Sequence, residues 1–384
     1  MSALRRSDSA QPPGKHRLAV IDAFRGVAAL GVFVFHAGVI AGFPKRVLPP
    51  VVVAGHRFSG VLSPVGLGAS GVSLFFVISG FCLMLQRLRA VQAGQPIPAR
   101  VYARNRFARI VPAYWTAVLF AAASWFFLGA NVPRVIRDTL VHLAFLHGFS
   151  GHTFLSLNDA LWSMITEAQF YLVFPWLAVW LERRGWRHFV AGTLVLTLAC
   201  RVLAILPPSR RLDFGVALPV LITNQLPGRL WEFALGMALA GLILGSTSGT
   251  RLARRFLWLL LVIVAPALCV RTWGPAVLSE PLLGLTYFAC AGFLLASRAS
   301  QPARDASRLW RWGGRFGRAS YSFFLLHVPV LLLTKAIFPS LASQPYALFG
   351  VLLVLGGPLA LIAAAVLYRG VELPLWTRLY VAHA

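Results

Sequence analysis

Apolar stretches of about twenty residues recur along the whole chain, and this feature restricts the possible fold more than any other. A helix of that length spans the hydrocarbon core of a bilayer. Inside lipid, only helices and closed barrels satisfy the hydrogen bonds of the backbone. The strict alternation of apolar and polar residues that marks a membrane barrel is absent from these stretches. The sequence therefore predicts an all-α polytopic membrane protein embedded in a lipid bilayer.

About ten spanning helices are expected, and the stretch 136–149 is too short and too polar to be another. A disordered basic tail (1–18) is expected before them, then a transmembrane domain (19–370), then a short tail (371–384). The predicted spans are 19–40, 67–86, 109–129, 158–181, 188–206, 226–245, 256–271, 281–297, 319–338 and 346–368.

The excess of positive charge lies mostly in loops on one side of these spans. The net charge is +25, from 36 Lys and Arg against 11 Asp and Glu. The two densest basic clusters, Arg87 to Arg109 and Arg298 to Arg318, fall on the side that also holds both termini. Positive loops mark the cytoplasmic face of a membrane protein. We therefore predict that both termini are cytoplasmic, and we attribute the charge to topology rather than to nucleic-acid binding.

The cysteines indicate neither a disulfide framework nor a metal site. All four lie inside or beside apolar stretches, and none forms a closely spaced pair: Cys82, Cys200, Cys269 and Cys290. Packing roles are expected for them, and no bound metal is expected elsewhere in the chain.

The first predicted span carries two polar groups on one face. Arg25 and His36 are eleven residues apart, which is about three helical turns and about 16 Å of rise. Asp22 lies one turn before Arg25 and is placed to pair with it. A neutral imidazole can accept the proton of a hydroxyl nucleophile. An interhelical hydrogen bond is the structural alternative for His36.

An arginine pair precedes the third span in "RNRFARIVPAYW". Arg106 and Arg109 lie one turn apart, an arrangement suited to phosphate groups. Arg104 and Tyr114 of the same motif are expected to bind the same phosphate-containing ligand. Topological anchoring is the alternative for the arginines.

Other spans also carry polar groups, and such groups within a membrane are functional candidates. Glu167 is surrounded by aromatic residues in "LWSMITEAQFYLVFP" and needs a partner. Arg229 and Glu232 have the spacing of a local ion pair, which favours a structural role. The remaining candidates are Ser79, Tyr321 and His327.

Taken together, these motifs resemble the membrane acyltransferase-3 family. The resemblance covers about residues 18 to 376. It depends on the order of seven motifs: the first-span arginine and histidine, "FFVISGF", "RFARIVPAYW", "WSMITEAQFY", "RLWEFALGM", "SYSFFLLHVPV" and the final "ELP".

The resemblance implies transfer of an acyl group, usually acetyl, from acyl-CoA on the cytoplasmic side of a bacterial inner membrane. The implied acceptor is a hydroxyl of a surface polysaccharide, a glycolipid or an antibiotic sugar. Arg25 and His36 match the paired first-helix residues of the family, Arg106 and Arg109 its cytoplasmic arginines, and Glu167 its buried acid. Some relatives carry an extracytoplasmic esterase-like domain, so a partner of that kind would here be a separate protein.

The mechanism expected from these assignments begins with the arginines, including Arg104, holding the phosphates of acyl-CoA. His36 then takes the acceptor proton, Glu167 orients the imidazole, and Arg25 guides the donor or pairs with Asp22. A proton-coupled transporter or flippase is the alternative function. The absence of internal repeats counts against it.

Overall fold

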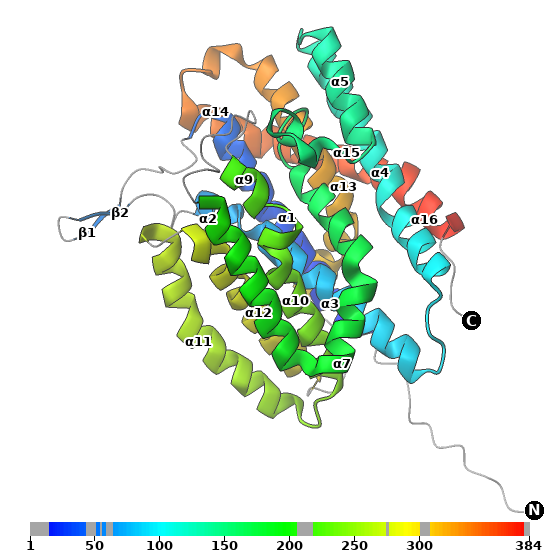
Figure 1. Ribbon diagram of the computed structural model, residues 1–384. Coiled ribbons are helices and arrows are strands. Elements are labelled where there is room, and N and C mark those ends of the chain that lie inside the picture. Colours follow the sequence, from blue (N-terminus) through cyan, green and yellow to red (C-terminus); the bar gives the residue numbers. More distant parts are fainter. Residues whose placement is uncertain are drawn as a thin grey trace, which may run out of the picture.

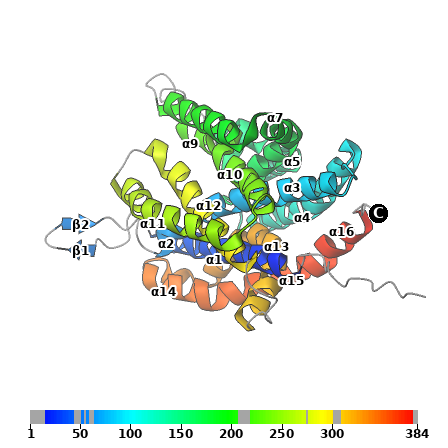
Figure 2. The same ribbon diagram turned by 90° about the horizontal axis from the view of Figure 1, so that it is seen from below.

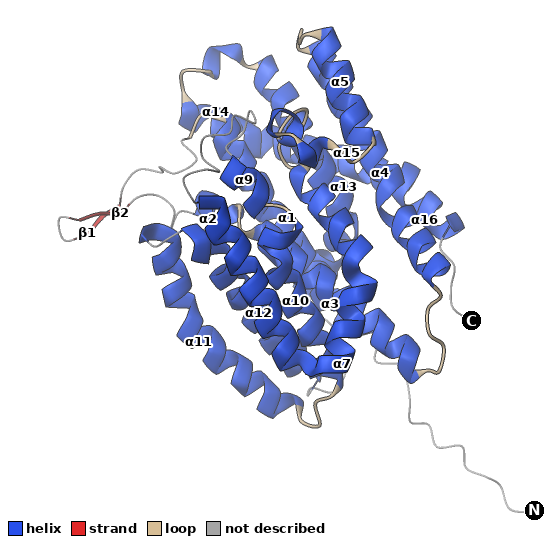
Figure 3. Ribbon diagram, in the orientation of Figure 1, coloured by secondary structure: helices blue, strands red, loops and turns tan. Residues whose placement is uncertain are grey.

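The computed structural model describes residues 15–43, 51–53, 56–58, 64–205, 218–273, 276–299 and 308–379, and nearly all of them are helical (Figures 1 and 3). The first half contains α1 (Lys15–Ile40), β1 (Val51–Val53), β2 (His56–Phe58), α2 (Pro64–Gly68), α3 (Gly71–Gln92), α4 (Ala99–Phe127), α5 (Val132–Leu143), the 3₁₀ turn η2 (His147–Phe149), α6 (Gly151–Phe154) and α7 (Trp162–Ile205). β1 and β2 pair antiparallel, with Val52 opposite Arg57.

The second half contains α9 (Leu218–Thr223), α10 (Leu226–Leu244), α11 (Gly249–Trp273), α12 (Ala276–Ala299), α13 (Arg308–Ile337), the 3₁₀ turn η3 (Pro339–Leu341), α14 (Pro345–Val351), the π-helix η4 (Leu352–Gly356), α15 (Gly357–Leu367), the π-helix η5 (Tyr368–Glu372) and α16 (Leu373–Leu379). The prediction of an all-α polytopic membrane protein is confirmed.

Nine helical segments of the described chain are long and apolar enough to cross a membrane, against ten predicted spans. The difference lies in α7, which runs through both the fourth and the fifth predicted span. Gly185 interrupts it with φ 75° and ψ 162°, a conformation outside the helical region. Only glycine adopts this conformation without strain. Residues on both sides of Gly185 reach the same part of the chain, because Thr166 donates to the Asn224 carbonyl and Arg201 donates to the Gly228 carbonyl. The two parts of α7 therefore fold back along each other as two helices, and the predicted break between these two spans is confirmed at Gly185.

The centre of the bundle is α10, most of which is buried. It packs against α3, α7 and α12, as the view along the bundle shows (Figure 2). The contact with α3 is made through Gly80 and Gly236. A β-carbon on Gly236 would lie 1.9 Å from the carbonyl oxygen of Val77, and one on Gly80 would lie 2.1 Å from that of Phe233. Small residues let membrane helices approach this closely.

A second group of helices, α1, α13 and α15, lies against this centre. α1 packs along α13, so the polar residues of both helices face the interior of the bundle together. The last transmembrane segment does not end at 368 as predicted but continues as a helix to Leu379. The π-turn η5 lies within it and buries Glu372. The predicted N-terminal tail lies outside the described residues, except for Lys15 to Leu18, which begin α1.

Candidate active site

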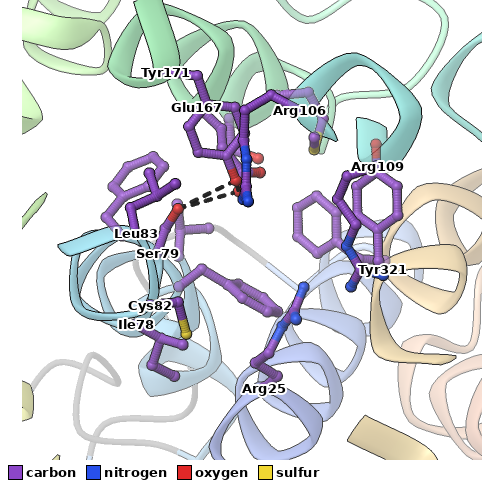
Figure 4. Close-up of a pocket in the computed structure, with 16 residues that line it drawn as sticks. Arg25, Ile78, Ser79, Cys82, Leu83, Arg106, Arg109, Glu167, Tyr171 and Tyr321 are labelled. Carbon is purple, nitrogen blue, oxygen red and sulfur yellow. Dashed lines mark hydrogen bonds between the residues drawn. The ribbon is translucent and has the colours of Figure 1, made fainter. Parts of the chain in front are cut away.

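Five helices converge on a cavity inside the bundle, which we call the first cavity (Figure 4). Its volume is about 100 Å³. The polar groups lining it come from α1, α3, α4, α7 and α13, and they are Arg25, Ser79, Cys82, Arg106, Arg109, Ser163, Glu167, Tyr171 and Tyr321. Six of the residues singled out from the sequence therefore meet here, although they come from distant parts of the chain.

Glu167 is held by hydroxyl groups in this cavity. Tyr171, one turn along α7, donates a short hydrogen bond to Glu167 Oε1. Ser79 of α3 lies 3.4 Å from the same oxygen and 3.3 Å from the Tyr171 hydroxyl. These contacts meet the need of a buried carboxylate for hydrogen-bond donors. The partner that the sequence left open for Glu167 is thus a pair of hydroxyls.

Arg106 and Arg109 enter the cavity from the start of α4. Arg106 donates to Gln86 Oε1 at 2.8 Å, and its guanidinium lies over the ring of Tyr171. Arg109 donates to Glu372 Oε1 at 2.9 Å, and Glu372 is almost completely buried. Arg109 is thereby fixed by a carboxylate outside the cavity lining, whereas Arg106 has no carboxylate within 4 Å among the described residues.

Arg25 points into the first cavity from α1 (Figure 4). In the part of the chain that the structure describes, its guanidinium forms no ion pair, so the expected pairing with Asp22 is not observed. Gly317 of α13 packs directly on the backbone of Asp22, where a β-carbon would lie 1.9 Å from the Asp22 carbonyl oxygen. This contact fixes the N-terminal part of α1 against α13, and Arg25 is directed at the cavity.

His36 lies further along α1, and its surroundings determine which ring nitrogen is basic. Its Nδ1 is 2.9 Å from the carbonyl oxygen of Val32. A carbonyl can only accept, so Nδ1 carries the proton and the lone pair of the neutral ring is on Nε2. Nε2 is the atom that lies 3.4 Å from Asp159 Oδ1. His36 can therefore take a proton at Nε2 and form an ion pair with Asp159 on doing so.

His327 of α13 supports this assignment. Its Nδ1 lies 2.7 Å from the carbonyl oxygen of Phe324 and must also be the protonated nitrogen. Its Nε2 then accepts from His36 Nδ1 at 3.1 Å. Both rings are almost completely buried. His327 thus fixes the orientation and tautomer of His36. The carboxylate that contacts the His36 imidazole is Asp159, not Glu167 as the sequence-based mechanism expected.

His36 lines a second cavity, of about 230 Å³, at the far side of Val72 from the first. Its polar lining consists of His36, Ser70, Ser73, Asp159, Asn224, Arg229, Arg271 and Glu280. The sequence predicted one polar route lined by both Arg25 and His36. The structure instead separates them into two cavities that share Val72. The rings of Phe75 and Phe324, 5.4 Å apart, line the first.

The remaining predicted residues lie elsewhere. Arg229 pairs with Glu232 at 3.1 Å, as their spacing predicted, and donates to Asn224. Arg104 is exposed on α4 and does not line the first cavity. Tyr114 is fully buried and donates to the His142 carbonyl, away from both cavities.

His142 and His147, outside the spans, stack in parallel beside Tyr114 at 4.2 Å. Burial lowers the pKa of both, that of His147 to about 3. The pair therefore stays neutral near pH 7. No cluster of three or more His, Cys, Asp or Glu side chains that could hold a metal occurs among the described residues.

Several site residues were not singled out from the sequence. Asp159 is one of them, since its spacing along the chain gives no sign of its contact with His36. Tyr171, Arg271, Glu280 and Glu372 contact the site through packing of distant helices, which spacing along the chain does not reveal. A signal did exist for Glu372, since an acid before a proline at the end of an apolar segment was noted in the final "ELP" motif.

Comparison with known proteins identifies the family to which this chain belongs. A family model described as an acyltransferase domain matches residues 18–369. Among curated proteins, the chain is 29% identical over 337 residues to the exopolysaccharide production protein ExoZ of Rhizobium meliloti, covering 84% of this chain and 92% of ExoZ. No solved structure matches the chain.

Two other relatives share this similarity. The acyltransferase MdmB of Streptomyces mycarofaciens is 26% identical, over 83% of this chain and 80% of MdmB. The peptidoglycan O-acetyltransferase OatA of Listeria monocytogenes is 24% identical, over 70% of this chain. The match covers 46% of OatA, so more than half of that protein has no counterpart here.

Proposed function

The chain belongs to the membrane acyltransferase family whose domain covers residues 18–369, and from this premise we propose that it transfers an acyl group, namely acetyl, from acyl-CoA to a carbohydrate hydroxyl. The names of ExoZ and OatA, which refer to an exopolysaccharide and to peptidoglycan, support a saccharide acceptor. The observation that carries the proposal is the arrangement of a cationic cavity next to a buried imidazole base.

The charge of the first cavity supports an acyl-CoA donor. Three guanidinium groups, from Arg25, Arg106 and Arg109, line it together with a single carboxylate, that of Glu167. Arginine is well suited to phosphate groups, because its planar fork makes charge-assisted hydrogen bonds. A volume of about 100 Å³ admits a narrow chain rather than a whole coenzyme. We therefore place the phosphates at the arginines and the pantetheine arm along Arg25 towards Val72.

The chemistry follows from the tautomer of His36. Nε2 takes the proton of the acceptor hydroxyl, and the oxygen attacks the thioester carbonyl carbon. The carbon–sulfur bond then breaks, and the thiolate of CoA leaves with the proton that His36 held. Asp159 stabilises the imidazolium between these steps, and His327 keeps the ring oriented. The acyl group ends as an ester on the acceptor, so atoms and charge balance.

The orientation of the chain in the membrane determines which compartment the donor comes from. We propose that the first cavity opens to the cytoplasm of a bacterial cell, because the adjoining ends of α3 and α4, which carry Arg87, Arg89, Arg100 and Arg104, lie at that end of the bundle. Acyl-CoA is made in the cytoplasm, so the arginines face the compartment that contains it. The same orientation leaves the second cavity on the side of His36 that is further from the cytoplasm.

Replacing Arg106 tests the donor site. Arg106→Gln should raise the acetyl-CoA concentration for half-maximal transfer by about tenfold, since a hydrogen bond to a charged group contributes about 1.5–3 kcal/mol and solvent reduces this value near the surface. Arg104→Gln is the matched control on the same helix, because Arg104 is exposed and outside the cavity. Equal acetyl-CoA dependence in both variants would show that Arg106 does not bind the donor and serves only as a topological anchor.

Cys82 reports directly on occupancy of the first cavity, which it lines. Dethio-CoA, which has no thiol, should slow modification of Cys82 by N-ethylmaleimide several-fold. Cys269 is exposed on α11 and serves as the internal control, since its modification should not change. Peptide mass spectrometry measures both. Equal modification of Cys82 with and without the ligand would exclude binding of the coenzyme in this cavity.

A further inference from the structure

The second cavity contains charged groups whose hydrogen-bonding capacity is not used within the described protein. Arg271 of α11 donates from Nη2 to the Gly66 carbonyl at 3.0 Å, and its Nε has no partner there. It forms no ion pair within 4 Å in that part of the chain. Asp159 contacts His36 at 3.4 Å and no arginine. A buried charge without such partners is costly unless a ligand supplies them.

The other charges of this cavity are already paired and serve as its framework. Arg229 is held by Glu232 and by the Asn224 side chain, and Glu280 accepts a short hydrogen bond from Arg201. Because acids and arginines balance, the cavity does not select for net charge. It offers a carboxylate that accepts and a guanidinium that donates, and a sugar hydroxyl both donates and accepts.

An aromatic surface completes the cavity. The indole of Trp162 lines it and lies under the guanidinium of Arg229, at 5.5 Å from the ring centroid. Nearly half of the lining residues are polar or charged, and the rest are apolar or aromatic. A pocket with an apolar wall and a few oriented polar groups is typical of a small-molecule site. A pyranose ring, with hydroxyls at its edge and C–H groups on its faces, matches this pattern.

A third cavity extends the site away from His36. It has a volume of about 520 Å³ and shares Asp159 and Leu155 with the second. Trp125, Asn131 and Arg134 lie on its wall, near the start of α5. Asp159 thus stands between a small compartment at the base and a larger one beyond it. The larger compartment has room for the part of an acceptor that is not acylated.

We propose that the second cavity is the acceptor site, that it binds a sugar ring of the acceptor, and that Arg271 and Asp159 position the hydroxyl at Nε2 of His36. This proposal rests on the acyltransferase function proposed above. The thioester end of the donor then passes Val72 from the first cavity and meets the acceptor hydroxyl at Nε2 of His36 in the second. Asp159 contacts the reacting base, and Arg271 is a positioning residue that acts on the acceptor.

The test separates acceptor dependence from donor dependence in full-length protein in lipid nanodiscs. The probes are [¹⁴C]acetyl-CoA and two fractions of host membranes: water-soluble glycan and lipid-linked saccharide. Arg271→Gln should raise the amount of the accepted fraction needed for half-maximal transfer by about tenfold, while the acetyl-CoA dependence stays within about twofold. Arg271→Lys should recover part of this loss. Arg106→Gln should show the reverse pattern.

The outcomes distinguish this proposal from the function on which it rests. The acceptor site is supported if label enters either saccharide fraction and Arg271→Gln changes the acceptor dependence but not the acetyl-CoA dependence. The fraction that is labelled identifies the source of the sugar. A change in acetyl-CoA dependence for Arg271→Gln, or no change at all, overturns it while the function stands. Label in a lipid without sugar also overturns it. If the wild-type protein transfers no label, both proposals fail. Protection of Cys82 by dethio-CoA verifies that the Arg271 variants are folded, since Arg271 does not line the first cavity.

Discussion

Replacing His36 with alanine should lower the rate of acyl transfer by about 10²–10⁴-fold, the range that a positioned general base contributes. The reason is geometric. Nε2 is the basic nitrogen because Val32 and His327 occupy Nδ1, and it faces the second cavity beside Asp159. Alanine removes the proton acceptor and leaves the first cavity, which His36 does not line, unchanged. The measurement is CoA thiol release per mole of purified protein.

The matched control for this variant is His188→Ala. His188 lies exposed near the kink in α7, far along the chain from either cavity lining. Its replacement should leave the rate within about twofold of wild type. Dethio-CoA should protect Cys82 equally in both variants, since the donor site does not include either histidine. Normal transfer by His36→Ala would show that the imidazole takes no part in the reaction. His36 would then have only the structural alternative given by the sequence, an interhelical hydrogen bond.

Replacing Gly236 with valine should prevent accumulation of folded protein. Any β-carbon at this position would lie 1.9 Å from the carbonyl oxygen of Val77, and the obstacle is backbone rather than a flexible side chain. α3 and α10 would have to separate, and α10 is the buried centre of the bundle. Several helix contacts would be lost together, so the effect should exceed the 2–5 kcal/mol typical of a large core truncation. Fluorescence-detected size-exclusion chromatography in detergent measures the folded fraction.

Gly241, five residues further along α10, provides the control. A β-carbon there meets no atom within 4 Å, so Gly241→Ala should give a wild-type elution profile. Alanine also favours a helix over glycine by about 1 kcal/mol. A monodisperse Gly236→Val protein with a normal melting temperature would show that α3 and α10 do not pack as described.

The helices were largely predictable because hydropathy and charge act locally. A stretch of about twenty apolar residues must be a helix in lipid wherever the rest of the chain lies. The difference between nine helical segments and ten predicted spans lies only in α7, where two helices meet at Gly185 with a positive φ and no loop between them. Sequence alone does not distinguish a sharp turn at one residue from a short loop.

The candidate site was predictable in composition but not in its partnerships. Helical spacing placed Arg25 and His36 on one face of α1, and both do face the interior. Their separation into two cavities that share Val72 of α3 involves other helices, which the spacing along α1 does not reveal. Likewise, Asp159 rather than Glu167 contacts His36, because Asp159 lies in the turn before α7 and Glu167 lies within that helix, facing the first cavity.

The central claim, that this chain carries an acyl group from acyl-CoA to a sugar hydroxyl, is tested most directly by isotope transfer. Purified protein in nanodiscs is given [¹³C]acetyl-CoA and the saccharide fractions of host membranes, and the products are analysed by mass spectrometry. The account predicts one labelled ester on a saccharide for each CoA thiol released, with both products lost in His36→Ala. Protein-dependent movement of a solute across the membrane, with acetyl-CoA left intact, would contradict it.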